Sequence, residues 1–77
     1  MPKLVPIHYT TLVQVFEYFG LKVARKKGDH IMMTKEGISR PVVIKTSPRK
    51  VSVSHIRTNL NTARISRAEY FDALAKL

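Results

Sequence analysis

The sequence predicts a small α+β protein in which helices cover one face of a three-stranded antiparallel sheet. Three observations predict this class: a helical spacing of apolar residues near the N-terminus, short β-type segments in the middle, and two helix-start signals near the C-terminus. The 77 residues leave room for one domain, spanning 1–77, with a modest core. The element order helix, three strands, helix, helix corresponds to a two-layer α-β-β-β-α(-α) sandwich.

The first helix is indicated by a single apolar face that ends at a glycine. Pro2 and Pro6 exclude a helix interior before it, and Gly20 is the expected C-terminal stop. The apolar positions between them recur every three or four residues and predict the buried face. These positions are Tyr9, Leu12, Val13, Phe16 and Phe19.

Three strands are predicted at residues 21–27, 30–35 and 40–46, the last rich in β-branched residues. A three-residue first turn, residues 27–29, puts Leu21 and Val23 on the same face as Ile31 and Met33, whereas a two-residue turn splits them. The apolar pattern therefore favours the longer turn. The opposite, open face then carries His30, Met32, Lys22, Lys26, Val43 and Lys45.

Two further helices are predicted from their N-terminal signals. Ser52 can cap the first of them, and the pair Ser66 and Glu69 has the spacing of a capping box that opens the last. Residues 46–50 between strand and helix are predicted to form a loop because Pro48 interrupts them. The expected core anchors of the last helix are Tyr70, Phe71, Leu74 and Leu77.

The composition points to a polyanionic partner. Lys and Arg number 14 against 5 Asp and Glu, giving a net charge of +9, and such a surface attracts nucleic acid above all. Binding of this kind weakens steeply with salt because each neutralised phosphate releases counterions. The chain has no cysteine, which excludes a disulfide framework and a thiolate zinc site and suits a reducing cytoplasm. Neither a membrane span nor a signal peptide is expected.

His30 is the candidate catalytic residue because it opens an apolar strand directly after Asp29 and two lysines. Metal-independent RNA cleavage needs a group that takes the proton of the attacking 2′-OH and cations that stabilise the crowded phosphate, and an imidazole exchanges a proton near neutral pH. Asp29 is the candidate orienter of the ring. The candidate phosphate-binding residues are Lys22, Lys26, Lys27, Lys45 and Arg57. The plainer alternative is that His30 is a solvent-facing strand residue without a role.

The other two histidines are expected at the surface. His8 precedes the first helix, as a capping residue would, and His55 falls in the first turn of the second helix. Few acidic residues and no cysteine accompany them, so no metal site and no cofactor are expected.

The order of these motifs resembles the HicA-type toxins, small mRNA interferases with a fold like that of double-stranded-RNA-binding domains. The resemblance covers residues 9–71. It implies that His30 cleaves mRNA and that a HicB-like antitoxin covers the open face of a cytoplasmic protein. Asp29 stands where the family usually has Ser or Thr, and Lys45 where it often has proline. The motifs that carry the resemblance are Phe19-Gly20-Leu21, Lys27-Gly28-Asp29-His30, Val42-Val43-Ile44, Ile56-Arg57 through Leu60, and Ile65-Ser66 with Glu69-Tyr70.

Three functions remain open from the sequence. The first is an endoribonuclease toxin of a type II toxin–antitoxin pair, and the second is a non-catalytic basic RNA-binding module of the same fold. The third is a ribosome-associated or architectural basic protein. Double-stranded-RNA-binding domains bind through helices and a lysine-rich helix N-terminus. The hairpin stretch KKGDH, residues 26–30, does not match that arrangement, which favours the nuclease.

Overall fold

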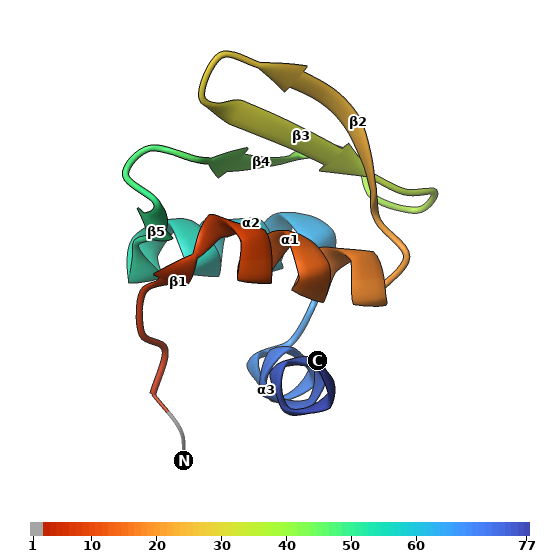
Figure 1. Cartoon of the computed structure of the whole chain (residues 1–77). Helices are drawn as coiled ribbons and strands as arrows, with labels where there is room; N and C mark the ends of the chain where they lie inside the picture. The colour runs from red at the N-terminus through yellow and green to blue at the C-terminus, as the bar shows by residue number, and fades with distance from the viewer. Residues whose placement is uncertain (1–2) are drawn as a thin grey trace.

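In the computed structural model, which describes residues 3–77, a three-stranded sheet lies over helices α1 and α2, and α3 lies on their far side (Figure 1). This arrangement confirms the predicted α+β fold with an antiparallel three-stranded sheet. Among these residues no helix is both long and apolar enough to cross a bilayer. The elements are β1 (Ile7–His8), α1 (Tyr9–Tyr18), β2 (Lys22–Lys27), β3 (His30–Thr34), β4 (Val42–Lys45), β5 (Lys50–Val51), α2 (Val53–Ala63) and α3 (Arg67–Lys76).

The core lies between the inner face of the sheet and helices α1 and α2, and it continues between these helices and α3. Strands β3 and β4 alternate buried and more exposed residues, as a sheet covered on one face requires. Leu77 is 53 % exposed, so its prediction as an anchor is wrong: it is the last residue, and α3 ends before it. The largest fully buried side chains are Tyr70, Phe16, Leu12, Leu21, Met33, Ile44, Ile56, Val15 and Val42.

The helix ends follow the predicted local signals. Ser52 is the N-cap of α2, where its hydroxyl accepts a hydrogen bond from the N–H of His55 at 3.3 Å. Ser66 and Glu69 form the predicted capping box, with reciprocal hydrogen bonds of 2.9 and 3.0 Å. Gly20 has a φ of 91°, the left-handed conformation that ends a helix at low steric cost.

A second, two-stranded ladder was not predicted. Strand β1 pairs with β5, and the N–H of Tyr9 donates to the carbonyl of Arg49 at 2.8 Å. The ladder fastens the start of α1 to the segment before α2. A two-residue strand shows no periodicity in the sequence, and Pro6 and Pro48 beside these strands suggested irregular chain.

The predicted three-residue turn between the first two strands is wrong. Lys27 pairs with His30, which leaves a two-residue turn, and an irregularity between Val23 and Arg25 adds the residue that the pattern required. Because this bulge inserts Ala24 into β2, Val23 still pairs with inward-facing Met33. From Arg25 to Lys27, after the bulge, each residue of β2 faces the side of the sheet opposite to the one predicted. Arg25 lies opposite Met32 on the open face, whereas Lys26 lies opposite buried Ile31 and therefore does not share the face of His30.

Candidate functional site

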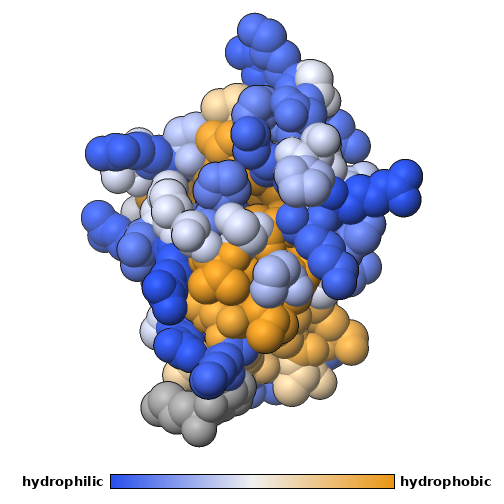
Figure 2. All heavy atoms as spheres, turned by 90° about the vertical axis from the view of Figure 1, so that its left-hand side faces the viewer, coloured by the Kyte–Doolittle hydropathy of each residue, from blue (hydrophilic) through white to orange (hydrophobic). Residues whose placement is uncertain are grey.

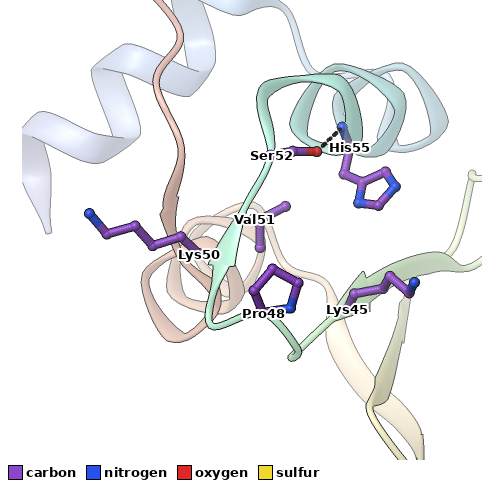
Figure 3. Close-up of a pocket in the computed structure, with 6 residues that line it drawn as sticks. All are labelled: Lys45, Pro48, Lys50, Val51, Ser52 and His55. Carbon is purple, nitrogen blue, oxygen red and sulfur yellow. Dashed lines mark hydrogen bonds between the residues drawn. The ribbon is translucent and has the colours of Figure 1, made fainter.

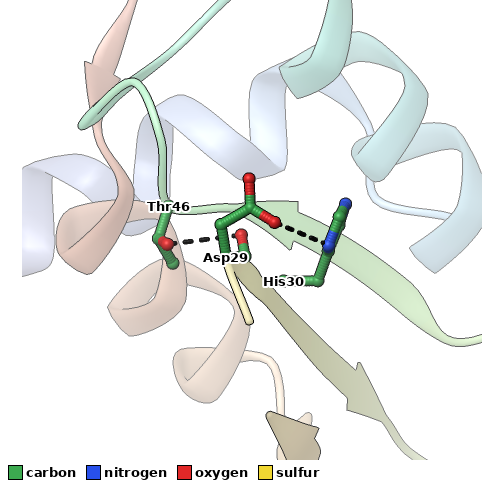
Figure 4. Close-up of polar contacts among 3 residues, drawn as sticks. All are labelled: Asp29, His30 and Thr46. Atoms are coloured by element: carbon green, nitrogen blue, oxygen red, sulfur yellow. Dashed lines mark hydrogen bonds and ion pairs between the residues drawn. The ribbon is translucent and has the colours of Figure 1, made fainter. Parts of the chain in front are cut away.

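The turn between β2 and β3 fixes the position of His30. Gly28 takes a φ of 56°, which a two-residue hairpin turn of the type II′ kind needs at its first position. Asp29 follows, and its carbonyl accepts hydrogen bonds from the N–H of Thr46 at 2.8 Å and from the Thr46 hydroxyl at 3.2 Å. Figure 4 shows this second bond beside the His30 ring. The turn is thus tied to the chain that leaves β4.

The imidazole of His30 faces solvent and contacts one carboxylate. Its Nδ1 lies 3.0 Å from Oδ1 of Asp29, and the two side chains are 44 % and 49 % exposed (Figure 4). A carboxylate accepts a hydrogen bond, so this contact favours a proton on Nδ1. In the neutral ring the lone pair then lies on Nε2, the nitrogen farther from Asp29.

Lysines flank His30 on both neighbouring strands. Lys27 of β2 and Lys45 of β4 are its partners in register, so the three residues form a row across the sheet. Side chains opposite one another on antiparallel strands project from the same face with Cβ atoms about 5 Å apart. The row Lys27–His30–Lys45, with Asp29 beside it, therefore combines a proton acceptor with two cations.

The other predicted phosphate-binding residues lie away from this row. Lys22 shares the open face but pairs with Thr34, at the far end of the hairpin. Lys26 lines a hollow between β2 and α1 on the inner side, and Arg57 belongs to α2, which packs against that inner side. Arg25, which was not predicted to bind phosphate, takes the place on the open face that was expected for Lys26.

A small hollow lies beside the row, where β4 ends and α2 begins (Figure 3). Its volume is about 110 Å³. The hollow was not predicted, although His55 was correctly expected at the surface in the first turn of α2. The lining residues are Lys45, Pro48, Lys50, Val51, Ser52 and His55.

Other ionisable groups lie on or next to helices α1 and α3, where they cap a helix, pair with a neighbouring side chain or are buried. The Nδ1 of His8 accepts from the N–H of Thr10 at 3.2 Å and caps α1. Burial raises the pKa of Tyr70, and the backbone N–H of Ser66, helped by its hydroxyl, lowers the pKa of Glu69. The pKa of Lys76 is raised chiefly by its hydrogen bond to Asp72. Within residues 3–77, no three His, Asp or Glu side chains gather as metal ligands would.

Comparison with known proteins adds no relative: no family model, no curated protein and no solved structure matches the chain. Any function proposed for the chain therefore depends on the geometry of the site.

Proposed function

We propose that the protein is a metal-independent endoribonuclease that cleaves mRNA through His30, the toxin of a HicA-type toxin–antitoxin pair acting in the cytoplasm. The observation that carries the proposal is the 3.0 Å contact between His30 Nδ1 and Asp29 within a row of lysines. An oriented, exposed imidazole between two cations has the parts that phosphodiester transfer needs.

The reaction we propose uses the ribose 2′-OH as nucleophile. His30 Nε2 takes the proton of this hydroxyl as its oxygen bonds to the adjacent phosphorus. Lys27 and Lys45 stabilise the negative charge that gathers on the phosphoryl oxygens. The bond from phosphorus to the 5′-oxygen breaks, and that oxygen takes a proton from water. The protonated ring of His30 then returns its proton to the hydroxide that remains. The products are a 2′,3′-cyclic phosphate and a 5′-hydroxyl end.

Both departures from the HicA-type pattern fall beside His30. Asp29 contacts the ring, and Lys45 is its partner on β4. In this chain the carboxylate of Asp29 orients the imidazole of His30, and Lys45 places a cation next to it. Each change supplies a group that the proposed reaction uses, so the departures agree with catalysis at His30.

The proposed protein partner is a HicB-like antitoxin that covers the open face and blocks His30. The net charge of +9 leads us to expect an acidic contact surface on that antitoxin. Such a complex would weaken as ionic strength rises because salt screens exposed charge pairs. An affinity that stays constant between low and high salt would contradict a mainly electrostatic contact.

The test compares wild type with His30→Ala in buffer containing EDTA, using single-stranded RNA as substrate. We expect wild type to cleave, and His30→Ala to lose about 100-fold or more of the rate because a positioned acid–base group contributes that much. Growth arrest on expression should be lost with it. His8→Ala controls for removal of an imidazole elsewhere. The proposal would be rejected if His30→Ala cleaved RNA as fast as wild type, or if EDTA abolished cleavage by wild type. If wild type bound RNA without cleaving it, the protein would be a non-catalytic RNA-binding module.

A further inference from the structure

We infer that the hollow beside His30 binds one nucleotide of single-stranded RNA, with its base against Pro48 and His55 and its phosphate at Lys45 and Lys50. This inference builds on the proposed nuclease function and names a substrate subsite for it. The hollow is formed by three segments: the end of β4, the chain through Pro48 to β5, and the first turn of α2 (Figure 3).

The lining of the hollow has the two chemistries that a nucleotide presents. Pro48 and buried Val51 give it an apolar wall, and the exposed ring of His55 stands at its edge. Unstacked RNA bases bind on aromatic and other flat side chains, including histidine. Lys45 and Lys50 add cations for the backbone phosphate. A ligand with only anionic groups would make no favourable contact with the apolar wall.

The hollow and the His30 row share a residue. Lys45 lines the hollow and is also the partner of His30 on β4. The next residue, Thr46, makes two hydrogen bonds to the carbonyl of Asp29, so the chain that enters the hollow is fixed to the turn that carries His30. One RNA strand can therefore place a phosphate at His30 and the neighbouring nucleotide in the hollow.

The surface around both features fits a single strand. The β2–β3 turn, the end of β4 and the start of α2 lie on the same side of the molecule in Figure 1. The space-filling view of that side shows mainly hydrophilic side chains in its upper part, at the level of the β2–β3 turn, and a broader apolar area lower down (Figure 2). A hollow of about 110 Å³ has room for a small planar group but not for a duplex. Single-stranded RNA, whose bases can turn outward, is the substrate that this surface favours.

The test measures binding without cleavage, so that it does not depend on catalysis. The ligand is a hexamer of 2′-O-methyl RNA, which lacks the attacking hydroxyl. Its comparison ligand is an abasic hexamer of the same backbone and charge. We expect wild type to prefer the hexamer with bases by about fivefold or more, the low end of what one base–aromatic stack contributes. His55→Ala should abolish this preference, and Ser54→Ala, on the same helical turn outside the hollow, should keep it.

A second pair of variants tests the phosphate contact. Lys50→Ala should weaken binding of both hexamers alike and reduce the slope of log affinity against log salt by about one, as expected for one lost phosphate contact. Lys76→Ala, which removes a cation from α3 far from the sheet, should leave the slope unchanged. Should His55→Ala fail to fold, as judged by circular dichroism, His55→Asn removes the ring while keeping a polar side chain.

The outcomes separate this inference from the nuclease proposal. If His55→Ala retains the preference for bases, or wild type binds both hexamers equally, the subsite is rejected whatever the protein cleaves. If the preference depends on His55 but His30→Ala cleaves as fast as wild type, the subsite stands and catalysis by His30 is rejected.

Discussion

His30 and His55 lie on the same side of the molecule and near the same lysine, but their surroundings differ. Lys45 is the cross-strand partner of His30 and lines the hollow with His55. His30 contacts the carboxylate of Asp29 at 3.0 Å, whereas no ion pair joins His55 to an acid in the described part of the chain. A carboxylate fixes the tautomer and orientation of an imidazole, and a ring without one offers mainly a face and an edge. This difference is the reason we propose proton transfer for His30 and base contact for His55.

Among the changes that test this difference, the largest effect is expected from substitution of Asp29, the carboxylate partner that His30 has and that His55 lacks among residues 3–77. Asp29→Asn should lower kcat at least about tenfold, because Asp29 contacts His30 as a carboxylate contacts a metal-bound histidine, where loss of the orienting partner typically costs about 10–100-fold. RNA affinity should not fall, because the substitution removes a negative charge from a basic surface. The measurement is cleavage kinetics in EDTA. Asp72→Asn, which removes an exposed carboxylate from α3, is the matched control. Unchanged kcat in Asp29→Asn would show that the carboxylate does not orient His30.

An intermediate effect on kcat/KM is expected from substitution of Lys45, which is the cross-strand partner of His30 and lines the hollow with His55. Lys45→Ala should lower kcat/KM for RNA by roughly tenfold, because it removes both a stabilising charge next to His30 and a phosphate contact at the hollow. Lys26→Ala removes the same charge from the opposite face of the sheet and should change kcat/KM by less than about twofold. Equal losses in the two variants would mean that only the total charge matters, and the distinction between the faces would fail.

The smallest effect concerns a carboxylate outside both sites. The pKa of Glu69 is lowered from 4.5 by its hydrogen bonds to Ser66, so its ionised form stabilises the folded state. That contribution is complete above pH 4.5 and is lost as the pH falls through the lower folded-state pKa. In chemical denaturation, Glu69→Gln should therefore be less stable than wild type at pH 6–7, and the difference should shrink under acid. Cleavage per folded molecule at neutral pH should not change. A difference that grows on acidification would contradict this contribution.

Features with local signals could be predicted from the sequence. Ser52, Ser66 and Gly20 end or begin helices through contacts within a few residues, and each was placed correctly. The order of strands and helices followed from apolar spacing. His30 was expected to face solvent, and its side chain is 44 % exposed in the structure.

Features set by distant segments could not be predicted in the same way. The apolar pattern required one extra residue between the inner positions of β2 and β3, and it could not distinguish a longer turn from the bulge at Ala24. The bulge moved Lys26 inward and Arg25 outward. The hollow depends on how residues 46–49 lead the chain back so that β5 pairs with β1, a long-range contact that leaves no pattern in the sequence.

The most direct test of catalysis by His30 uses one RNA oligonucleotide with a 2′-O-methyl group on every ribose except one, incubated with wild type in EDTA. We expect a single cut, directly 3′ of the free 2′-OH, leaving a 2′,3′-cyclic phosphate and a 5′-hydroxyl, and no cut by His30→Ala. Cleavage at methylated positions, or products ending in 3′-hydroxyl and 5′-phosphate, would show that water and not the 2′-OH attacks, and would contradict the chemistry assigned to His30.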